Sequence, residues 1–167
     1  GGSLRSCFEY ARLNNADAMV VIDGDGQHDP DDIPKLLGPV LSGQADLVVG
    51  SRFVENLSEI PGYRKFGIRV ITFLFNFGSR MKTTDAQSGF RVYNQRVIGS
   101  VNIHEKGMSA SIEILEQARA KRATLKDIPI SCSYDSSSIS LKAIRHGLSV
   151  AFSVVKIRLL NRLFYRS

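Results

Sequence analysis

The junction between an apolar run and an acidic loop, at residues 22 and 23, places the strongest constraint on how this chain folds. The run ADAMVVI (residues 16–22) is rich in apolar and β-branched side chains and predicts a short, buried strand. It is followed at once by DGDGQHDPDD (residues 23–32), in which five of ten residues are aspartates. In open α/β sheets, ligands bind beyond the carboxyl ends of the strands. The acidic loop is therefore expected at the ligand-binding edge of such a sheet.

Predicted strands and helices alternate along the rest of the chain, which is typical of an α/β sheet with helices on its faces. Apolar periodicity predicts strands over residues 16–23, 45–53 and 123–134, a short strand at the end of residues 82–94, and helices over residues 4–14, 29–43, 63–81 and 109–122. Asp29 is the expected cap of the second helix. Pro129 cannot donate a backbone hydrogen bond, so the last strand is expected near an edge of the sheet.

The domain organisation follows from the length and from the first element. The chain has 167 residues, which corresponds to about one domain. It begins inside a predicted helix, one step before its first strand, and few strands remain for a doubly wound sheet. We therefore expect a Rossmann-like sheet whose first βα units are missing from this sequence. The predicted parts are a partial domain over residues 1–146 and a basic amphipathic helix over residues 147–167.

Charge and composition limit the partners and the environment of the protein. The net charge is +6, and no acidic residue follows Asp135. The basic tail fits a membrane surface, or else packing on the core or on another chain. It lacks the interleaved aromatic groups that nucleic-acid binding uses, so we expect no nucleic acid. No apolar run is long enough to cross a bilayer, and the widely spaced Cys7 and Cys132 fit buried thiols in a reducing, cytoplasmic compartment.

The acidic loop offers oxygen ligands for a hard divalent cation. Asp23 and Asp25 are each followed by a glycine, which lets the backbone turn tightly. Together with Gln27 they favour Mg²⁺ or Mn²⁺, bound along with substrate phosphates. An EF-hand calcium loop is excluded, because the positions that need Gly and Glu hold His28 and Pro34. A solvated acidic turn is the remaining alternative, and His28 is left outside the predicted ligand set.

Three blocks of sequence together resemble the family 2 glycosyltransferases of the GT-A fold. They are VVIDGDGQHDPDDIPKLL (residues 20–37), ADLVVGSRF (residues 45–53) and TTDAQSGFRVY (residues 83–93). Within that family the chain is most similar to the polyprenyl (dolichyl) phosphate sugar transferases, the dolichol-phosphate mannose synthase group. The resemblance covers almost the whole chain. It implies a metal-dependent enzyme that transfers a hexose from a nucleotide-diphosphate sugar, of the GDP-mannose or UDP-glucose class, to a polyprenyl phosphate.

The resemblance also implies roles for residues of the first two blocks and of the helix that follows them. Asp25 and Gln27 would be metal ligands, and Asp23 would contact the metal or the sugar nucleotide. Arg52 would bind the acceptor phosphate, for which the fork of a guanidinium is well suited. Arg64 would be a second phosphate-binding arginine. For Arg52 the alternative is a surface ion pair.

In the third block, the resemblance makes Asp85 the catalytic residue, which would orient the sugar or act as a base. Ser88 and Arg91 would hold the loop and the diphosphate side of the substrate. The alternative is a plain turn in which Asp85 caps its own backbone. The loop YDSSSIS (residues 134–140) lacks the basic residue that the family often has over the diphosphate.

We expect the transferase in the cytoplasm, at the cytoplasmic face of a membrane. Two other functions remain as alternatives. A chain without its first βα units would lack most of the nucleotide pocket. It would then serve as a binding or assembly module, since an exposed sheet edge can pair with another chain or with a second copy. A nucleotidyltransferase or phosphohydrolase would use the same metal site, although hydrolases usually assemble more metal ligands, often with histidines.

Overall fold

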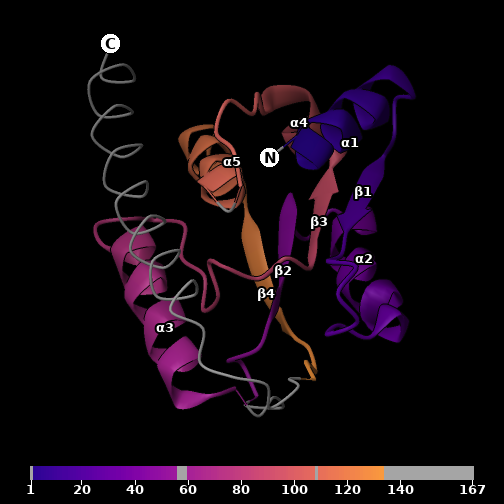
Figure 1. Cartoon of the computed structure of the whole chain (residues 1–167). Helices are drawn as coiled ribbons and strands as arrows, with labels where there is room; N and C mark the ends of the chain where they lie inside the picture. Colours follow the sequence, from indigo (N-terminus) through magenta and orange to yellow (C-terminus); the bar gives the residue numbers. More distant parts are fainter. Residues whose placement is uncertain (1, 56–59, 108, 134–167) are drawn as a thin grey trace.

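The computed structural model describes residues 2–55, 60–107 and 109–133 of the chain, in which helices and strands alternate (Figure 1). The strands are β1 (Ala18–Val21), β2 (Leu47–Ser51), β3 (Arg91–Asn94) and β4 (Leu125–Pro129). The helices are α1 (Gly2–Leu13), α2 (Ile33–Leu41), α3 (Gly62–Asn76), α4 (Gln95–Ser100) and α5 (Ser109–Ala120), and a 3-10 turn (Pro30–Asp32) leads into α2.

The four strands form one mixed sheet in the order β1-β3-β2-β4. β3 pairs antiparallel with both β1 and β2, whereas β4 pairs parallel with β2. Consequently β1, β2 and β4 run in one direction and β3 runs in the other. β4 lies at an edge of this sheet, which confirms the expectation based on Pro129.

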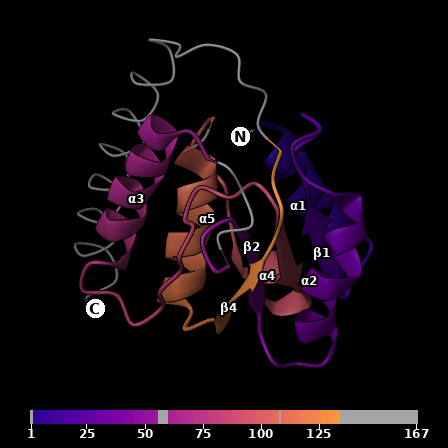
Figure 2. The ribbon, with the colours of Figure 1, turned by 90° about the horizontal axis from the view of Figure 1, so that it is seen from below.

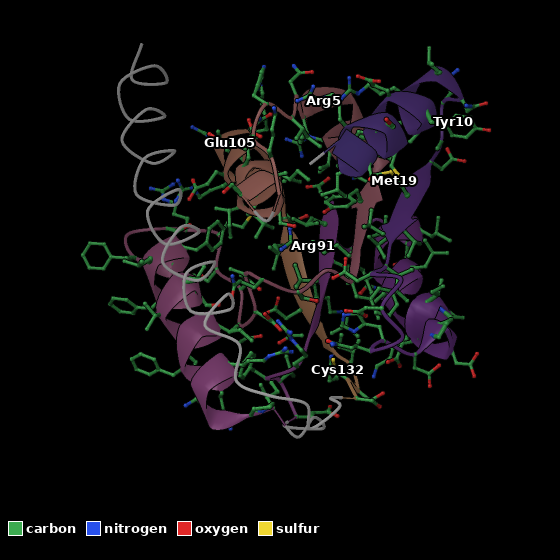
Figure 3. The ribbon with its side chains drawn as sticks, viewed as in Figure 1. Arg5, Tyr10, Met19, Arg91, Glu105 and Cys132 are labelled. Atoms are coloured by element: carbon green, nitrogen blue, oxygen red, sulfur yellow. The ribbon has the colours of Figure 1, made fainter. Side chains whose placement is uncertain are left out.

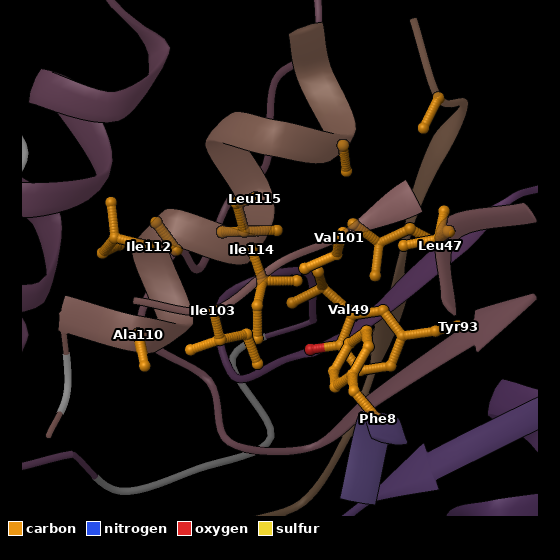
Figure 4. Packing of buried hydrophobic residues seen from close by; sticks show 14 of the residues in the cluster. Phe8, Leu47, Val49, Tyr93, Val101, Ile103, Ala110, Ile112, Ile114 and Leu115 are labelled. Carbon is orange, nitrogen blue, oxygen red and sulfur yellow. The ribbon is translucent and has the colours of Figure 1, made fainter. Parts of the chain in front are cut away.

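Helices cover both faces of the sheet, which confirms the predicted α/β architecture (Figures 1 and 2). On one face, α1, α3, α4 and α5 share a core that includes Phe8, Leu47, Val49 and Tyr93 (Figure 4). On the other face, α2 packs on a smaller core that includes Val48. Successive side chains of a strand point to opposite faces, which is why Leu47 and Val49 enter one core and Val48 enters the other.

Most predicted elements occur, with differences at their ends. α3 ends at Asn76 rather than at residue 81, because Gly78 takes a positive φ of 63° just beyond it. α4 was not predicted, since six residues are too few to show a helical period. Its local signal is Asn94, whose side chain accepts a hydrogen bond from the backbone N–H of Val97 at 2.9 Å. Asp29 is a cap, as predicted, but it caps the 3-10 turn before α2.

Two further expectations concern exposure and the end of the chain. Cys132 is buried but Cys7 is exposed, so the expectation that both thiols are buried is wrong for Cys7. The predicted boundary at residue 146 and the helix over residues 147–167 lie outside the described residues. In the part of the chain that is described, none of the helices is both long enough and apolar enough to cross a bilayer.

Asp46, just before β2, connects β2 to β3 and to the start of β4 through hydrogen bonds. It lies at the end of the strands opposite the acidic loop. Its carboxylate accepts hydrogen bonds from the N–H and hydroxyl of Thr124 at 2.8 and 2.9 Å and from the Asn94 amide at 2.8 Å. Arg96 adds an ion pair at 3.2 Å. Burial acts to raise the pKa of Asp46, but these hydrogen bonds and the Arg96 charge outweigh it, so that the pKa lies below its ordinary value.

A pKa that is lowered by folding predicts how stability depends on pH. The unfolded chain takes up the Asp46 proton first, near pH 4, so this stabilisation is complete above about pH 4 and is lost as the pH falls through the lowered pKa. Asp46→Asn should therefore lower the free energy of unfolding by about 1–3 kcal/mol near pH 6 and by much less near pH 3. Urea unfolding at the two pH values measures this. Glu9→Gln, a change of an exposed carboxylate on α1, should matter little at either pH.

Candidate active site

The direction of β3 brings the three blocks of sequence to one edge of the sheet. The carboxyl ends of β1, β2 and β4 lie at this edge, so the segments after them, which begin at Ile22, Arg52 and Ile130, start there. Because β3 runs the other way, the segment that precedes it, residues 82–90, also arrives at this edge. Blocks that are far apart in the sequence therefore meet, as expected for a binding site beyond the ends of parallel strands.

Asp23 is held against the backbone of the third block. A Cβ atom added to Gly89 would lie only 1.8 Å from Oδ2 of Asp23, so no side chain fits at position 89 unless the carboxylate moves. A cavity of about 240 Å³ opens beside this contact. Its lining includes Asp23, Gln87, Gly89 and Ser111, together with residues from the first turn of α1.

Asp25 and Gln27 complete the predicted ligand set on the same loop. Asp25 is exposed, and its Oδ1 accepts a hydrogen bond from the backbone N–H of Gln27 at 3.0 Å. The carbonyl of Gln27 accepts from the N–H of Ser133 at 2.9 Å, which fastens the loop to the chain after β4. Among the described residues, no three His, Cys, Asp or Glu side chains cluster as a closed metal site. An open set of two carboxylates and one amide fits Mg²⁺ or Mn²⁺, which keep waters and phosphate oxygens among their ligands.

His28 is buried in the middle of this region, although the sequence analysis left it outside the ligand set. Its ring lies 5.6 Å from the ring of Phe90, and its Nδ1 has no hydrogen-bond partner among the described residues. Burial lowers the pKa of His28, and the charge of Arg52 lowers it further. The carboxylates of Asp23, Asp25 and Asp85 act in the opposite direction without reversing the shift. His28 therefore lies near the acidic loop and the Arg52–Asp85 pair, with a pKa below the ordinary value of a histidine.

Arg52 and Asp85, from two different blocks, form a bidentate ion pair. Nε and Nη2 of Arg52 lie 2.6 and 2.8 Å from the two carboxylate oxygens of Asp85. The Asp85 side chain is fully buried and that of Arg52 is 10% exposed. The ion pair expected as an alternative for Arg52 thus exists, but it is buried and joins two candidate site residues. Removing one partner of such a pair leaves a buried charge without compensation.

Asp127 on β4, which the sequence analysis did not single out, anchors both sides of this ion pair. Its carboxylate accepts from the hydroxyl of Thr83 at 2.7 Å, and from the N–H and hydroxyl of Thr84 at 2.5 and 2.7 Å. Thr83 in turn accepts from the N–H of Asp85 at 3.1 Å. Ser51, beside Arg52, is hydrogen-bonded to the Thr84 hydroxyl at 2.6 Å. One carboxylate therefore fixes the segments that carry the acid and the arginine.

Arg91 is buried near the centre of the molecule, between the sheet and α5 (Figure 3). Its guanidinium donates to the carbonyl of Ala86 and to that of Ser111 on α5, both at 2.8 Å. Ser88 is also buried, and its hydroxyl accepts from the N–H of Phe90 at 3.2 Å. Both residues thus make hydrogen bonds to the backbone of the third block, and Arg91 also bonds to α5. Their expected roles toward the substrate stay predictions. Neither side chain is exposed to solvent.

Arg64 is the remaining residue of the predicted site. It lies in the first turn of α3, is half-buried, and follows a segment that includes residues 56–59, which are outside the described range. Its predicted role in phosphate binding stays a prediction.

Comparison with known proteins identifies relatives of this chain. Residues 1–101 match the model of glycosyl transferase family 2. The UDP-N-acetylglucosamine–dolichyl-phosphate N-acetylglucosaminyltransferase of Methanococcus voltae is 30% identical over 84% of the chain. The undecaprenyl-phosphate mannosyltransferase of Micrococcus luteus is 26% identical over 78% of it. The chain spans 57% and 55% of the lengths of these two relatives.

A solved structure with the same fold contains both a metal and a sugar nucleotide. It is glucosyl-3-phosphoglycerate synthase from Mycobacterium tuberculosis in complex with Mn²⁺, UDP-glucose and phosphoglyceric acid. The TM-score is 0.63 over 90% of this chain and 54% of that chain, at 15% sequence identity. At that identity the likeness shows the fold alone, and it confirms the predicted GT-A fold class.

The Asp127 network predicts a loss of stability when its acceptor is removed. Asp127→Ala leaves two hydroxyls and one N–H without their acceptor, so the free energy of unfolding should fall by about 2 kcal/mol or more. Lys126→Ala, which alters the exposed neighbour on the same strand, should change it by less than about 0.5 kcal/mol. Chemical denaturation of both variants measures the difference. Equal stabilities would show that the network does not hold the segments together.

Proposed function

Because this chain belongs to glycosyl transferase family 2, we propose that it transfers a hexose from a nucleotide-diphosphate sugar to a polyprenyl phosphate in a metal-dependent reaction. The observation that carries the proposal is the meeting of the acidic loop with the buried Arg52–Asp85 pair at one edge of the sheet. The two relatives named for dolichyl-phosphate and undecaprenyl-phosphate transfer support the lipid class of the acceptor. The sugar donor is of the GDP-mannose or UDP-glucose class.

Asp23, Asp25 and Gln27 are the residues that would hold Mg²⁺ or Mn²⁺. A bound metal would supply positive charge that stabilises the nucleoside diphosphate as it leaves. The chain's own contribution is to keep Asp23 in position through its contact with Gly89 and to shape the Asp25 turn through Gln27. The Mn²⁺ and UDP-glucose bound by the structural neighbour support this choice of metal and donor.

Arg52 and Asp85 would act on the acceptor side. The acceptor phosphate is already ionised, so its oxygen needs orientation and charge compensation more than a general base. The Asp85 carboxylate accepts two hydrogen bonds from the Arg52 guanidinium and would orient it toward the phosphate. Arg64, at the start of α3, is the second candidate phosphate ligand. Ser88 and Arg91 would keep the loop over the diphosphate side in place.

A second candidate function is a binding or assembly module without turnover. Among the described residues, β1 pairs with β3 on one side and with no other strand. An open edge of this kind can accept a strand from the rest of a longer protein or from a second copy. We favour the transferase, acting at the cytoplasmic face of a membrane. Strand pairing at an open edge requires neither a buried ion pair nor an exposed acidic loop, whereas a site for a metal and a phosphate uses both.

The metal proposal is tested by binding of Mn²⁺ and a sugar nucleotide. We expect the thermal midpoint of the wild type to rise with Mn²⁺ together with UDP-glucose or GDP-mannose, because a ligand that binds the native state stabilises it. Asp25→Asn should abolish the rise. Asp31→Asn, the same change at an exposed residue of the same acidic segment, should keep it. If the thermal midpoint of Asp25→Asn still rises with these ligands, the predicted ligand set is wrong.

The contact between Gly89 and Asp23 gives an independent test. Gly89→Ala places a methyl group where the Asp23 carboxylate lies, so Mn²⁺ affinity should fall by roughly 10–100-fold, as for residues that orient a metal ligand. Gly99→Ala is the matched control, since an added Cβ there meets no atom within 4 Å. Calorimetric titration with Mn²⁺ compares the two variants, and circular dichroism checks that both are folded. If Gly89→Ala binds Mn²⁺ with unchanged affinity, Asp23 is not part of the metal site.

A further inference from the structure

A second cavity, which we call the α1 cavity, opens between α1 and the segment that follows α4, residues 101–107. Its volume is about 370 Å³. Three residues of α1 and three of that segment line it: Arg5, Glu9, Arg12, Asn102, Ile103 and His104. None of them lines the cavity beside Asp23. In Figure 3, Arg5 lies at one end of the molecule, and Cys132, which follows β4 beside the candidate active site, lies at the other.

The α1 side of this cavity is a charged stripe next to the buried side of the helix. Arg5, Glu9 and Arg12 occupy positions i, i+4 and i+7, which at 3.6 residues per turn fall within a sector of about 60°. Leu4 and Phe8 occupy the neighbouring sector and pack into the core. Packing of α1 on the domain therefore uses the apolar sector, and the charged stripe is left to face the cavity.

Backbone carbonyls hold both arginines against the segment after α4. Nε of Arg5 donates to the carbonyl of Ile103 at 2.9 Å, and its Nη2 donates to that of His104 at 3.5 Å. Arg12 donates in the same way, from Nε and Nη2, to two carbonyls at the end of α4. A guanidinium has five N–H donors. In the described part of the chain, Nη1 of each arginine makes no hydrogen bond, so each retains donors for a ligand.

Neither arginine is paired with a carboxylate among the described residues. The ion pairs in those residues join other side chains, and Glu9 lines the cavity without pairing with Arg5 or Arg12. Carbonyl oxygens carry only partial charge, so they orient a guanidinium without neutralising it. Two oriented guanidiniums of this kind suit a phosphate group, whose oxygens accept charge-assisted hydrogen bonds from the arginine fork.

The opposite wall of the cavity is fixed from α5. Glu113 accepts from the N–H groups of His104 and Glu105 at 2.9 and 2.8 Å, and Gln117 exchanges two hydrogen bonds with the backbone of Asn102. Nδ1 of His104 lies 3.2 Å from the Glu113 carboxylate, and the side chain is 79% exposed. The ring can therefore offer its other nitrogen to a ligand, and the wall does not have to rearrange to receive one.

We propose that the α1 cavity binds a small phosphate-bearing molecule with hydroxyl groups, of the sugar phosphate class. The remaining N–H groups of Arg5 and Arg12 bind its phosphate. The carboxylate of Glu9 and the amide of Asn102 bind its hydroxyl groups. Hydroxyls are part of the proposal because Glu9 repels a bare anion, whereas it accepts a hydrogen bond from a hydroxyl.

This inference goes beyond the proposed function, because it concerns a separate cavity and needs neither a metal nor sugar transfer. The experiments below contain no divalent metal and no sugar nucleotide. Their failure would therefore leave the transferase proposal untouched, and a failure of the transferase proposal would leave this one untouched.

Chemical shifts of the isotopically labelled full chain locate a bound probe. Glucose 6-phosphate should shift the Nε–H signals of Arg5 and Arg12 and the backbone amides of residues 102–104 in a saturable way. Inorganic phosphate should shift the same signals with about two- to tenfold weaker affinity, because it lacks the hydroxyl groups that Glu9 and Asn102 bind. Glucose, which has no phosphate, should shift none of them. Equal shifts at Arg80, an exposed arginine outside the cavity, would show general attraction of anions and would overturn the proposal.

Two variants test the roles of the charges. Arg5→Gln should weaken the binding of glucose 6-phosphate by about tenfold or more, because it removes a charge-assisted donor. Arg80→Gln is the matched control and should bind as the wild type does. Arg5 also fastens the segment after α4, so a second variant leaves those contacts in place. Glu9→Gln, at an exposed residue, should tighten the binding of inorganic phosphate by about two- to fivefold, because it removes a like charge.

Three results would contradict the proposal. They are the absence of a saturable shift with glucose 6-phosphate, unchanged affinity in a folded Arg5→Gln, and equal phosphate affinity of Glu9→Gln and the wild type. If Arg5→Gln does not fold, as judged by circular dichroism, the comparison of Glu9→Gln with the wild type decides.

Discussion

The antiparallel placement of β3 between β1 and β2 is the constraint on which the candidate site depends. In a fully parallel sheet, the segment that follows each strand reaches the binding edge, and the segment before it lies at the opposite edge. Here β3 pairs antiparallel with β1 and β2, so for this strand it is the preceding segment that reaches the binding edge. The segment that carries Asp85, Ser88 and Gly89 therefore arrives beside the acidic loop. Without this reversal, Asp85 and Arg52 would lie at opposite ends of the sheet.

Buried charges keep the converging segments in fixed positions. The Arg52–Asp85 pair and the Arg91 guanidinium are removed from water, which is costly unless each charge is compensated or hydrogen-bonded. The carboxylate, the backbone carbonyls and the Asp127 network provide those partners. Burial raises the pKa of the Tyr93 phenol in the same region, against the effect of Arg91. Such a network costs stability to assemble, and its use at a ligand-binding edge fits the need to hold donors and acceptors ready before substrate binds.

The sequence alone determined the features that are local. The alternating periods predicted most helices and strands, Pro129 predicted the edge position of β4, and the spacing in DGDGQ identified Asp23, Asp25 and Gln27 as one loop after a strand. These inferences work because a helical period, a cap or a turn depends on neighbours within a few residues. The resemblance of three ordered blocks to one family supplied the fold class and the candidate residues of the other blocks.

Tertiary structure decided every relation between distant segments. Arg52 and Asp85 are separated by 33 residues, and Thr83 and Asp127 by 44, and no local pattern records that they are hydrogen-bonded. The buried position of His28 and the contact of Asp23 with Gly89 depend in the same way on how the sheet brings loops together. The exposure of Phe66, Phe73 and Phe77 could not be read from the sequence either, because α3 is apolar on both sides and only its packing shows which side is inside.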